Sequence, residues 1–285
     1  MRRFTVAALT LLLTAFAHAT NPPGFCRFAG TLSPDSAYEF IWAPTGLPPE
    51  ARADLKEWPA NTKIDFEGAD FDSYLYDNTR HRLLARLPDF NHFEGMGMRK
   101  NRGEFHVAWA PDSRSAIAIC EERWDDAAIV WVEPAANRVT SLKDALEKAY
   151  AHVLLTKEKD RGSVMQFSDP AILPNGILVI EGRAGHEKEG PYFNHRLTFR
   201  ISDVKGKIRA ELLKAVRIEG EHNADYDPDL NLYYGKLRDR LDDKGRAALK
   251  QEEKDWLAWR DKQPEDAREK LTERRAVELR ARYEY

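Results

Sequence analysis

The sequence is poor in the patterns that mark catalytic and metal-binding proteins. Its 285 residues include only two cysteines. No His-Glu-x-x-His motif or paired Cys/His spacing occurs, so the common zinc motifs are missing. A Gly-x-Ser-x-Gly elbow and a Walker phosphate loop are missing as well. We therefore expect a protein without enzymatic activity, cofactor or metal ion, although catalytic groups scattered along a chain would leave no such motif.

An excess of positive charge is also missing. The chain has 44 Lys and Arg against 47 Asp and Glu, a formal charge of −3. A mildly acidic protein is not expected to bind nucleic acid or an anionic membrane surface. Loss of residues 1–19, discussed next, removes two arginines and no acids and changes the formal charge from −3 to −5.

The long apolar run of this sequence lies at the N-terminus. The chain opens MRRFTVAALTLLLTAFAHA, in which two arginines precede an apolar stretch and Ala17-His18-Ala19 follows it. This order is typical of a secretory signal peptide, and the stretch is too short to span a bilayer permanently. We expect an exported protein, periplasmic or secreted, that is cleaved after Ala19 and does not insert into the membrane.

The two cysteines, Cys26 and Cys120, fit the expected compartment. In an oxidising environment such a pair favours one disulfide. Closing a loop of about 95 residues would stabilise the protein by roughly 4–5 kcal/mol in the chain-entropy description. The alternative interpretation is two buried thiols without a bridge.

Residues 20–222 predict a mostly β domain of unknown role. Short runs of β-branched and aromatic residues alternate with Pro, Asp, Asn and Gly. A Trp-Ala-Pro-Asp-Ser turn at 109–113 resembles β-propeller turns, but no repeat is visible. An irregular sheet or sandwich is therefore favoured over propeller-like hairpins. The expected elements are strands at 38–42, 105–109, 116–119, 129–132, 176–182 and 195–202, a hairpin in 74–87, and a helix over 141–155 with Ser141 as its N-cap.

Residues 223–285 predict three charged helices, each with one apolar face. Such helices must bury these faces, so we expect a small three-helix bundle and an α+β chain overall. On the second helix, Trp256 and Trp259 share a face with Leu249, which predicts one ridge inside the bundle. The helices are expected from Asp227 (N-cap) and Pro228 to about Leu241, from Asp242-Asp243 to about Lys262, and from Pro264 onward.

Arg275 lies on the apolar face of the third predicted helix. A buried guanidinium requires carboxylate or carbonyl partners, and Asp261 and Glu278 are the candidates. Such an ion pair would fix the register of the bundle, or Arg275 would contact a partner protein.

The three helices resemble the N-terminal domain of the LprI-type lysozyme inhibitors. That family has Asp-x-x-Leu-Asn followed by Tyr, then a helix with Leu and Trp that ends in Arg-Asp, and then Thr-x-x-Arg-x-x-Glu-Leu. The family's cysteines, and its loop between the second and third helices, are absent from the run RDKQPED at 260–266. The matching residues, which the resemblance gives a structural or binding role, are Asp229 (or Asp227), Leu230, Asn231, Tyr234, Leu249, Trp256, Arg260, Asp261, Thr272, Arg275, Glu278 and Leu279.

The resemblance implies a periplasmic protein-binding or inhibitor protein directed at lysozyme. One alternative is an envelope interaction module whose β domain is the recognition surface. Another is a cell-wall hydrolase without a recognisable motif.

Three further segments carry weaker signals. Alternate acids at 225–229 resemble the start of a calcium loop, but Gly and Glu are missing at its sixth and twelfth positions, and helix capping explains the acids. His186 and His195 could meet across a hairpin, either as a metal or acid/base site or as ordinary surface histidines. The Gly-rich, basic stretch 93–105 predicts an exposed loop.

Overall fold

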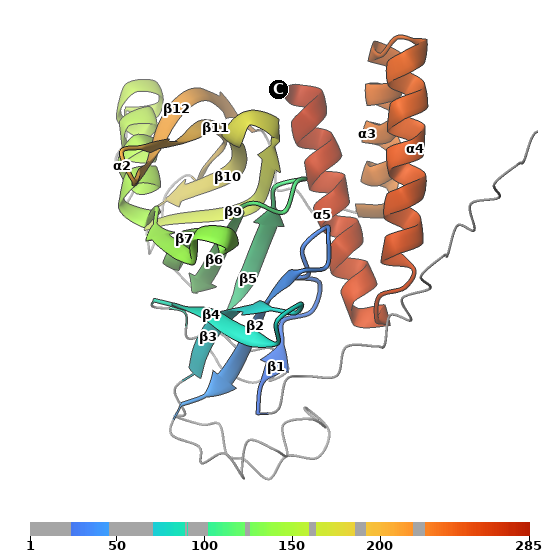
Figure 1. Ribbon diagram of the computed structural model, residues 1–285. Coiled ribbons are helices and arrows are strands. Elements are labelled where there is room, and N and C mark those ends of the chain that lie inside the picture. Colours follow the sequence, from blue (N-terminus) through green and yellow to red (C-terminus); the bar gives the residue numbers. More distant parts are fainter. Residues whose placement is uncertain are drawn as a thin grey trace, which may run out of the picture.

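The computed structural model describes residues 24–45, 71–88, 90, 102–122, 126–159, 164–185, 192–218 and 226–285. The predicted signal peptide and its cleavage site lie outside these residues. The described part is α+β, with three four-stranded antiparallel sheets and four helices (Figure 1). The predicted fold class is therefore confirmed at this level. No helix within the described ranges combines the length and apolarity needed to cross a membrane.

Each sheet is a meander whose strands are adjacent in the sequence, in the orders β1-β2-β3-β4, β5-β6-β7-β8 and β12-β11-β10-β9. The first sheet contains β1 (Cys26–Arg27), β2 (Tyr38–Pro44), β3 (Phe71–Asp77) and β4 (Arg82–Leu87). The second contains β5 (Arg102–Trp109), β6 (Ala116–Glu122), β7 (Asp126–Glu133) and β8 (Arg138–Ser141). The third contains β9 (Val164–Leu173), β10 (Ile177–Gly185), β11 (Phe193–Val204) and β12 (Lys207–Arg217).

The hairpin predicted within residues 74–87 is formed by β3 and β4. Asp77 ends β3, and its carboxylate accepts hydrogen bonds from the backbone N–H groups of Thr79 (3.0 Å) and Arg80 (2.9 Å). An Asp that bonds to the backbone two and three residues ahead favours a turn at that point. The local sequence thus fixes where the chain reverses.

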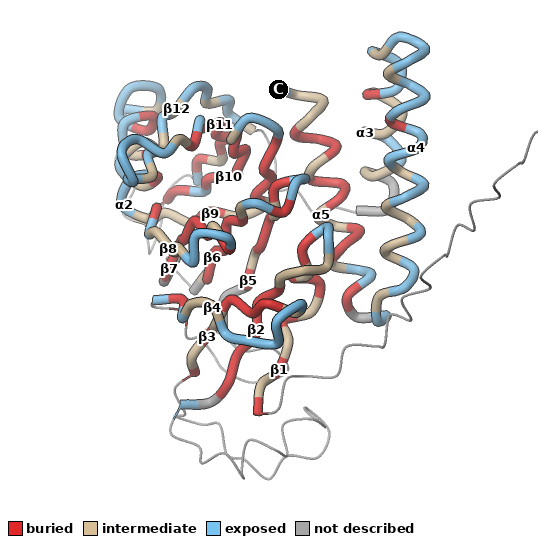
Figure 2. Tube along the Cα trace, in the orientation of Figure 1, coloured by how far each residue is buried: buried red, intermediate tan, exposed pale blue. Residues whose placement is uncertain are grey.

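Two large apolar clusters hold the sheets together. The first and second sheets share one cluster, in which the rings of Phe28 and Phe105 stack with centroids 4.3 Å apart. The second and third sheets share the other with α2 (Lys143–Val153), whose Leu146, Tyr150 and Val153 are buried. Figure 2 shows this buried material concentrated in the strands. The second sheet therefore contributes to both clusters, with Ile117 and Ile119 in one and Ala116 and Ala118 in the other.

The predicted N-cap of α2 was wrong. Ser141 is the last residue of β8, and the cap position falls on Leu142, which makes no side-chain cap. Leu142 is only 1% exposed because its side chain packs in the shared core, and its N–H donates to Ile129 O at 2.8 Å. Burial of Leu142 therefore sets where the helix begins. A π-helical turn, η3 (Leu154–Glu158), follows α2.

Three helices complete the chain: α3 (Tyr226–Arg240), α4 (Asp243–Arg260) and α5 (Glu265–Glu284). The described part of α3 begins at Tyr226, so Asp227 lies inside the helix. The prediction that Asp227 is its N-cap was therefore wrong. The expected cap of α4 is present, since the Asp242 carboxylate accepts the Gly245 N–H at 2.7 Å.

α5 lies between the sheets and the α3–α4 hairpin (Figure 1). Its Val277 and Ala281 are buried in a cluster with β9 and β10 of the third sheet. Its Leu279 meets Leu237 of α3 and Leu249 of α4 in a separate, smaller cluster. A self-contained three-helix bundle is therefore not clearly what the protein forms, because α5 uses one of its faces to pack on the β-rich part.

The N-terminal half of α5 also approaches the β1–β2 loop. Gly30 has a φ of +67°, and a Cβ at this position would lie 2.9 Å from the Cβ of Lys270. Only glycine combines this backbone conformation with so close a contact. The loop and the helix are thus fitted to each other.

Candidate functional site

The predicted buried arginine, Arg275, is the centre of an ion cluster between α4 and α5. Its side chain is 4% exposed and donates hydrogen bonds to Glu252 (2.8 Å), Glu253 (2.9 Å) and Glu278 (2.8 Å). Burial lowers the pKa of Arg275, but the charges of Glu278, Glu253 and Glu252 outweigh it and raise the pKa above its ordinary value. The expected pairing with Glu278 is present. The alternative partner, Asp261, does not take part in this cluster.

Asp261 pairs with its neighbour instead. Its Oδ1 accepts hydrogen bonds from the guanidinium of Arg260 at 2.8 and 3.1 Å. The same guanidinium lies 5.2 Å from the ring centre of Trp256 and 3.5 Å from the hydroxyl of Thr272. The motif residues at the end of α4 therefore gather around one face of an indole. Arg275 lies 5.8 Å from the same Trp256 ring.

The predicted tryptophan ridge is not the core of the helical part. Trp256 and Trp259 are half-buried, and the buried side chain of α4 is Leu249, at 2% exposure. The indole N–H of Trp259 donates to the hydroxyl of Ser36 in the β1–β2 loop, at 3.2 Å. The two indoles face Arg275 of α5 and the β1–β2 loop, but they are only partly buried. The prediction that they form the core of the helical part was therefore wrong.

The motif residues of α3 lie along its contact with α5. Leu230 and Tyr234 are partly buried against the cluster that contains Leu279, which is fully buried. Asp229 is half-buried and lines a crevice with Ala276, Val277 and Arg280 of α5. Asn231 is exposed. Most of these residues therefore have a packing role, and Asn231 is available to solvent.

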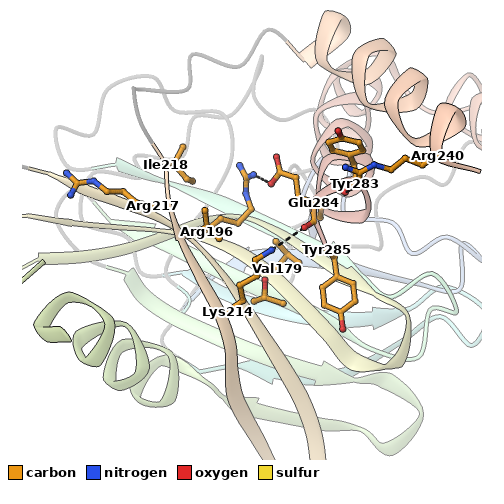
Figure 3. A pocket seen from close by; sticks show the side chains of 12 residues that line it. Val179, Arg196, Lys214, Arg217, Ile218, Arg240, Tyr283, Glu284 and Tyr285 are labelled. Carbon is orange, nitrogen blue, oxygen red and sulfur yellow. Dashed lines mark hydrogen bonds and ion pairs between the residues drawn. The ribbon is translucent and has the colours of Figure 1, made fainter. Parts of the chain in front are cut away.

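A pocket of about 470 Å³ opens where the third sheet meets the C-terminal turn of α5 (Figure 3). Its floor comes from β10, β11 and β12, and Arg240 at the end of α3 closes one side. The sequence did not indicate it, because its residues are spread over more than one hundred positions. The lining residues are Val179, Arg196, Thr198, Lys214, Val216, Arg217, Ile218, Arg240, Ala281, Tyr283, Glu284 and Tyr285.

A buried charge network supports the floor of this pocket. Glu181 Oε1 accepts hydrogen bonds from Arg196 and Arg280, both at 2.7 Å, and Arg280 also contacts Asp169 at 3.3 Å. Burial and the nearby charge of Glu181 raise the pKa of Asp169 above its ordinary value, although the charge of Arg280 opposes this effect. Glu181 and Arg196 are direct partners on adjacent strands. The sequence signal for this contact was an acid that directly follows an apolar run in β10 and a cation on the next strand.

His195 belongs to a second buried group. Its Nε2 lies 3.1 Å from Glu158, whose other oxygen accepts a hydrogen bond from Arg217 at 2.5 Å. Its Nδ1 is 3.3 Å from the Tyr150 hydroxyl, which lies 2.7 Å from Phe193 O. Burial lowers the pKa of His195, and the nearby carboxylate of Glu158 opposes this effect. Tyr150 and His195 are both 0% exposed, so this group ties α2 and η3 to the third sheet.

The remaining predicted sites have different outcomes. Cys26 and Cys120 are buried in the same cluster, but they are not at disulfide distance, so the bridge stays a prediction. His186, Asp225 and residues 93–101 lie outside the described residues, and His195 contacts Tyr150 and Glu158. Residues 102–105 belong to β5, so the prediction of an exposed loop was wrong for them. Within the described ranges, no group of three or more His, Cys, Asp or Glu residues is arranged to hold a metal ion.

Comparison with known proteins identified no relative of this chain. No protein-family model matches the chain, and no curated protein and no solved structure is significantly similar to it. The likeness to LprI-type inhibitors therefore rests on the residues and their spacing alone.

Proposed function

We propose that this chain is an exported protein that binds and inhibits lysozyme through the partly open surface around Trp256 and Arg260 at the end of α4. One observation carries the proposal. All the side chains of α4 are described, and only Leu249 is buried, while Trp256 is half-buried beside the Arg260 guanidinium. Trp and Arg are enriched at the energetic centres of protein interfaces, where one face of the ring packs against the partner.

The sequence resemblance supports the same surface. Trp256, Arg260 and Asp261 match the LprI-type motif and lie together at the end of α4. In this proposal α3, α4 and α5 act as one helical domain, residues 223–285. The ion cluster of Arg275 holds α4 on α5, and α5 in turn rests on the third sheet.

The expected compartment is also consistent with this partner. A signal peptide would deliver the protein to the space where lysozyme reaches the cell wall. The family's extra cysteines and loop are missing here, so the proposal assigns the contact to the hairpin surface itself. Binding would then depend on Trp256 more than on any loop between α4 and α5.

The test is lysozyme turbidity clearance with the full chain. The full chain is required because α5 buries Val277 and Ala281 against β9 and β10, and an isolated tail would expose them. We expect dose-dependent protection of the cells by the wild type and loss of protection by Trp256→Ala. The control is Leu155→Ala, which removes a side chain that is 44% exposed on η3, outside the hairpin.

Each other outcome contradicts a specific part of the proposal. Absence of protection by the wild type excludes lysozyme as the partner. Equal loss of protection in Leu155→Ala and Trp256→Ala excludes the hairpin as the binding surface and favours the β-rich part. Faster clearance when lysozyme is left out indicates a cell-wall hydrolase.

A further inference from the structure

The pocket between the third sheet and the end of α5 has an unusual balance of charge. Its lining side chains include four cations, Arg196, Lys214, Arg217 and Arg240, and one carboxylate, Glu284. Arg217 is also paired with Glu158, which lies outside the lining. The chain as a whole has a formal charge of −3. A concave surface with such a local excess of positive charge attracts anions.

The Arg196 side chain is held in position by an ion pair beneath the pocket, as the side chain of a ligand-binding residue commonly is. Its side chain is 12% exposed, and the carboxylate of Glu181 fixes one edge of the guanidinium at 2.7 Å. Glu181 is shared with Arg280, so its single charge is divided between two guanidinium groups. The charge of Arg196 is therefore only partly neutralised from beneath the pocket. A planar guanidinium fixed along one edge presents its other N–H groups to a carboxylate.

The other terminal nitrogen of the Arg196 guanidinium already contacts a carboxylate of the protein itself. Glu284, in the last turn of α5, forms an ion pair with Arg196, and Figure 3 shows the two side chains pointing toward each other. Lys214 reaches the same turn, with its Nζ 3.4 Å from the main-chain oxygen of Glu284. The Glu284 side chain is 33% exposed. A change in the Glu284 side chain need not disturb the rest of α5, because Val277 and Ala281 hold that helix on the third sheet.

Apolar side chains and tyrosine rings also line the pocket beside these cations. Val179 is buried beneath the pocket, and Val216 on β12 is 46% exposed and borders the opening. The rings of Tyr283 and Tyr285 line the side formed by α5, and the Tyr283 ring lies 3.7 Å from the Arg240 guanidinium. Small-molecule sites combine such apolar walls with a few fixed polar groups, and about 470 Å³ is within their usual range.

We propose that this pocket binds a small organic carboxylate with an apolar body. The ligand carboxylate replaces that of Glu284 on Arg196 and pairs with Lys214, and its hydrocarbon part lies between Val216 and the tyrosine rings. Glu284 is then an internal competitor for the site. This site is separate from the α4 surface assigned to a protein partner, and neither proposal depends on the other.

The test is isothermal titration calorimetry of the full chain with octanoate as the probe. Glu284→Gln removes the competing charge, so octanoate should bind this variant several-fold more tightly than the wild type. Lys214→Met keeps the length of the side chain and removes its charge, so affinity should fall by roughly tenfold, as expected for the loss of one charge-assisted contact. The matched control is Arg200→Met on the adjacent strand β11, which removes a guanidinium that is 53% exposed, pairs with Glu211 and lies outside the pocket. Its affinity should equal that of the wild type.

A neutral probe of the same shape separates charge recognition from apolar binding. We expect 1-octanol to bind at least tenfold more weakly than octanoate. The proposal is overturned if 1-octanol binds as tightly as octanoate, if Lys214→Met and Glu284→Gln both keep the wild-type affinity, or if Glu284→Gln shows no heat of binding. Far-UV circular dichroism of each variant establishes that it is folded, so that a loss of binding reports on the pocket.

Discussion

Two buried charges of this protein, Asp77 and Arg275, are each held by several partners. Asp77 is 0% exposed, and its carboxylate accepts four hydrogen bonds from Thr79 and Arg80. Arg275 is 4% exposed and has three carboxylates around it. A buried charge without a partner costs several kcal/mol, so multiple bonds are needed to keep such groups inside. Removing one partner therefore destabilises more than the loss of a surface ion pair would.

Asp77 makes the stability of the protein depend on pH. Burial raises the pKa of Asp77, but the hydrogen bonds from Thr79 and Arg80 outweigh this effect, and the pKa lies below its ordinary value. The carboxylate is thus fully stabilising above about pH 4, and its contribution is lost as pH falls through the lower pKa of the folded state. We expect Asp77→Asn to be less stable at pH 7 and to lose less stability on acidification. Urea unfolding at a series of pH values measures both effects.

The control for this prediction is Asp112→Asn, which changes a carboxyl that is 59% exposed. Its free energy of unfolding should stay within about 0.5 kcal/mol of the wild type. If Asp77→Asn and the wild type lose equal stability between pH 7 and pH 2, the carboxylate of Asp77 is not a source of the acid sensitivity.

α4 packs through one small contact and leaves much of its surface open. Leu249 enters the cluster with Leu237 and Leu279, while Trp256 and Trp259 are half-buried. Figure 2 shows α4 mainly in the colours of exposed and intermediate residues. An element of this kind depends on a single buried side chain and on ion pairs for its position.

The two large apolar side chains of α4 should differ in their effect on stability. Leu249→Ala leaves a cavity in a closed cluster and should lower the free energy of unfolding by about 2–5 kcal/mol. Trp256→Ala removes a half-buried ring and its contacts with two guanidinium groups, and should cost about 1–2 kcal/mol. Urea denaturation followed by circular dichroism compares the two variants. A larger loss in Trp256→Ala would mean that the indole is a true core residue.

α5 connects the helices to the sheets, so the protein should unfold as one unit. Val277 and Ala281 are buried against the third sheet, and Arg280 forms ion pairs with Asp169 and Glu181. Two parts that share buried residues and buried charges lose those contacts together. Independent helical and β domains would instead unfold in separate transitions.

Substitution of Arg280 tests this connection. Arg280→Met leaves Asp169 and Glu181 without their shared cation, and should destabilise the chain by about 3–5 kcal/mol. Far-UV circular dichroism and tryptophan fluorescence should shift to lower urea concentration together. Arg238→Met is the control, because Arg238 is exposed on α3 and pairs with its neighbour Asp239. Loss of the helical signal in a separate, earlier transition would show that α5 is not coupled to the sheets.

The sequence predicted the helices and strands better than it predicted which surfaces pack against each other. Runs such as 116–119 and 129–132 became β6 and β7, since β-branched residues in short apolar runs favour strands. β12 was missed because it is an edge strand, where charged residues such as Lys207, Arg209 and Glu211 replace the apolar run. The spacing of Trp256 and Trp259 gave their shared helical face correctly. It could not show that the opposing surface consists of Arg275 of α5 and the β1–β2 loop.

The candidate sites were likewise predictable only where they depend on residues that are close in the sequence. The environment of Arg275 was partly predictable, because Glu278 lies three residues away on the same helix. Its other partners, Glu252 and Glu253, depend on how α4 lies beside α5. The pocket could not be predicted, because it requires the last turn of α5 to lie over β10, β11 and β12, and no local pattern specifies that docking.

The arrangement of each sheet from consecutive strands has a consequence for biosynthesis. Every strand finds its hydrogen-bonding neighbours nearby in the sequence, so each sheet can assemble as soon as its own segment has emerged, starting from the N-terminal end. The exception is α5, which is made last and covers Val179 and Leu173 of the third sheet. Until it arrives, that apolar surface is bare, and a nascent chain stalled before residue 265 would be the species most prone to aggregate.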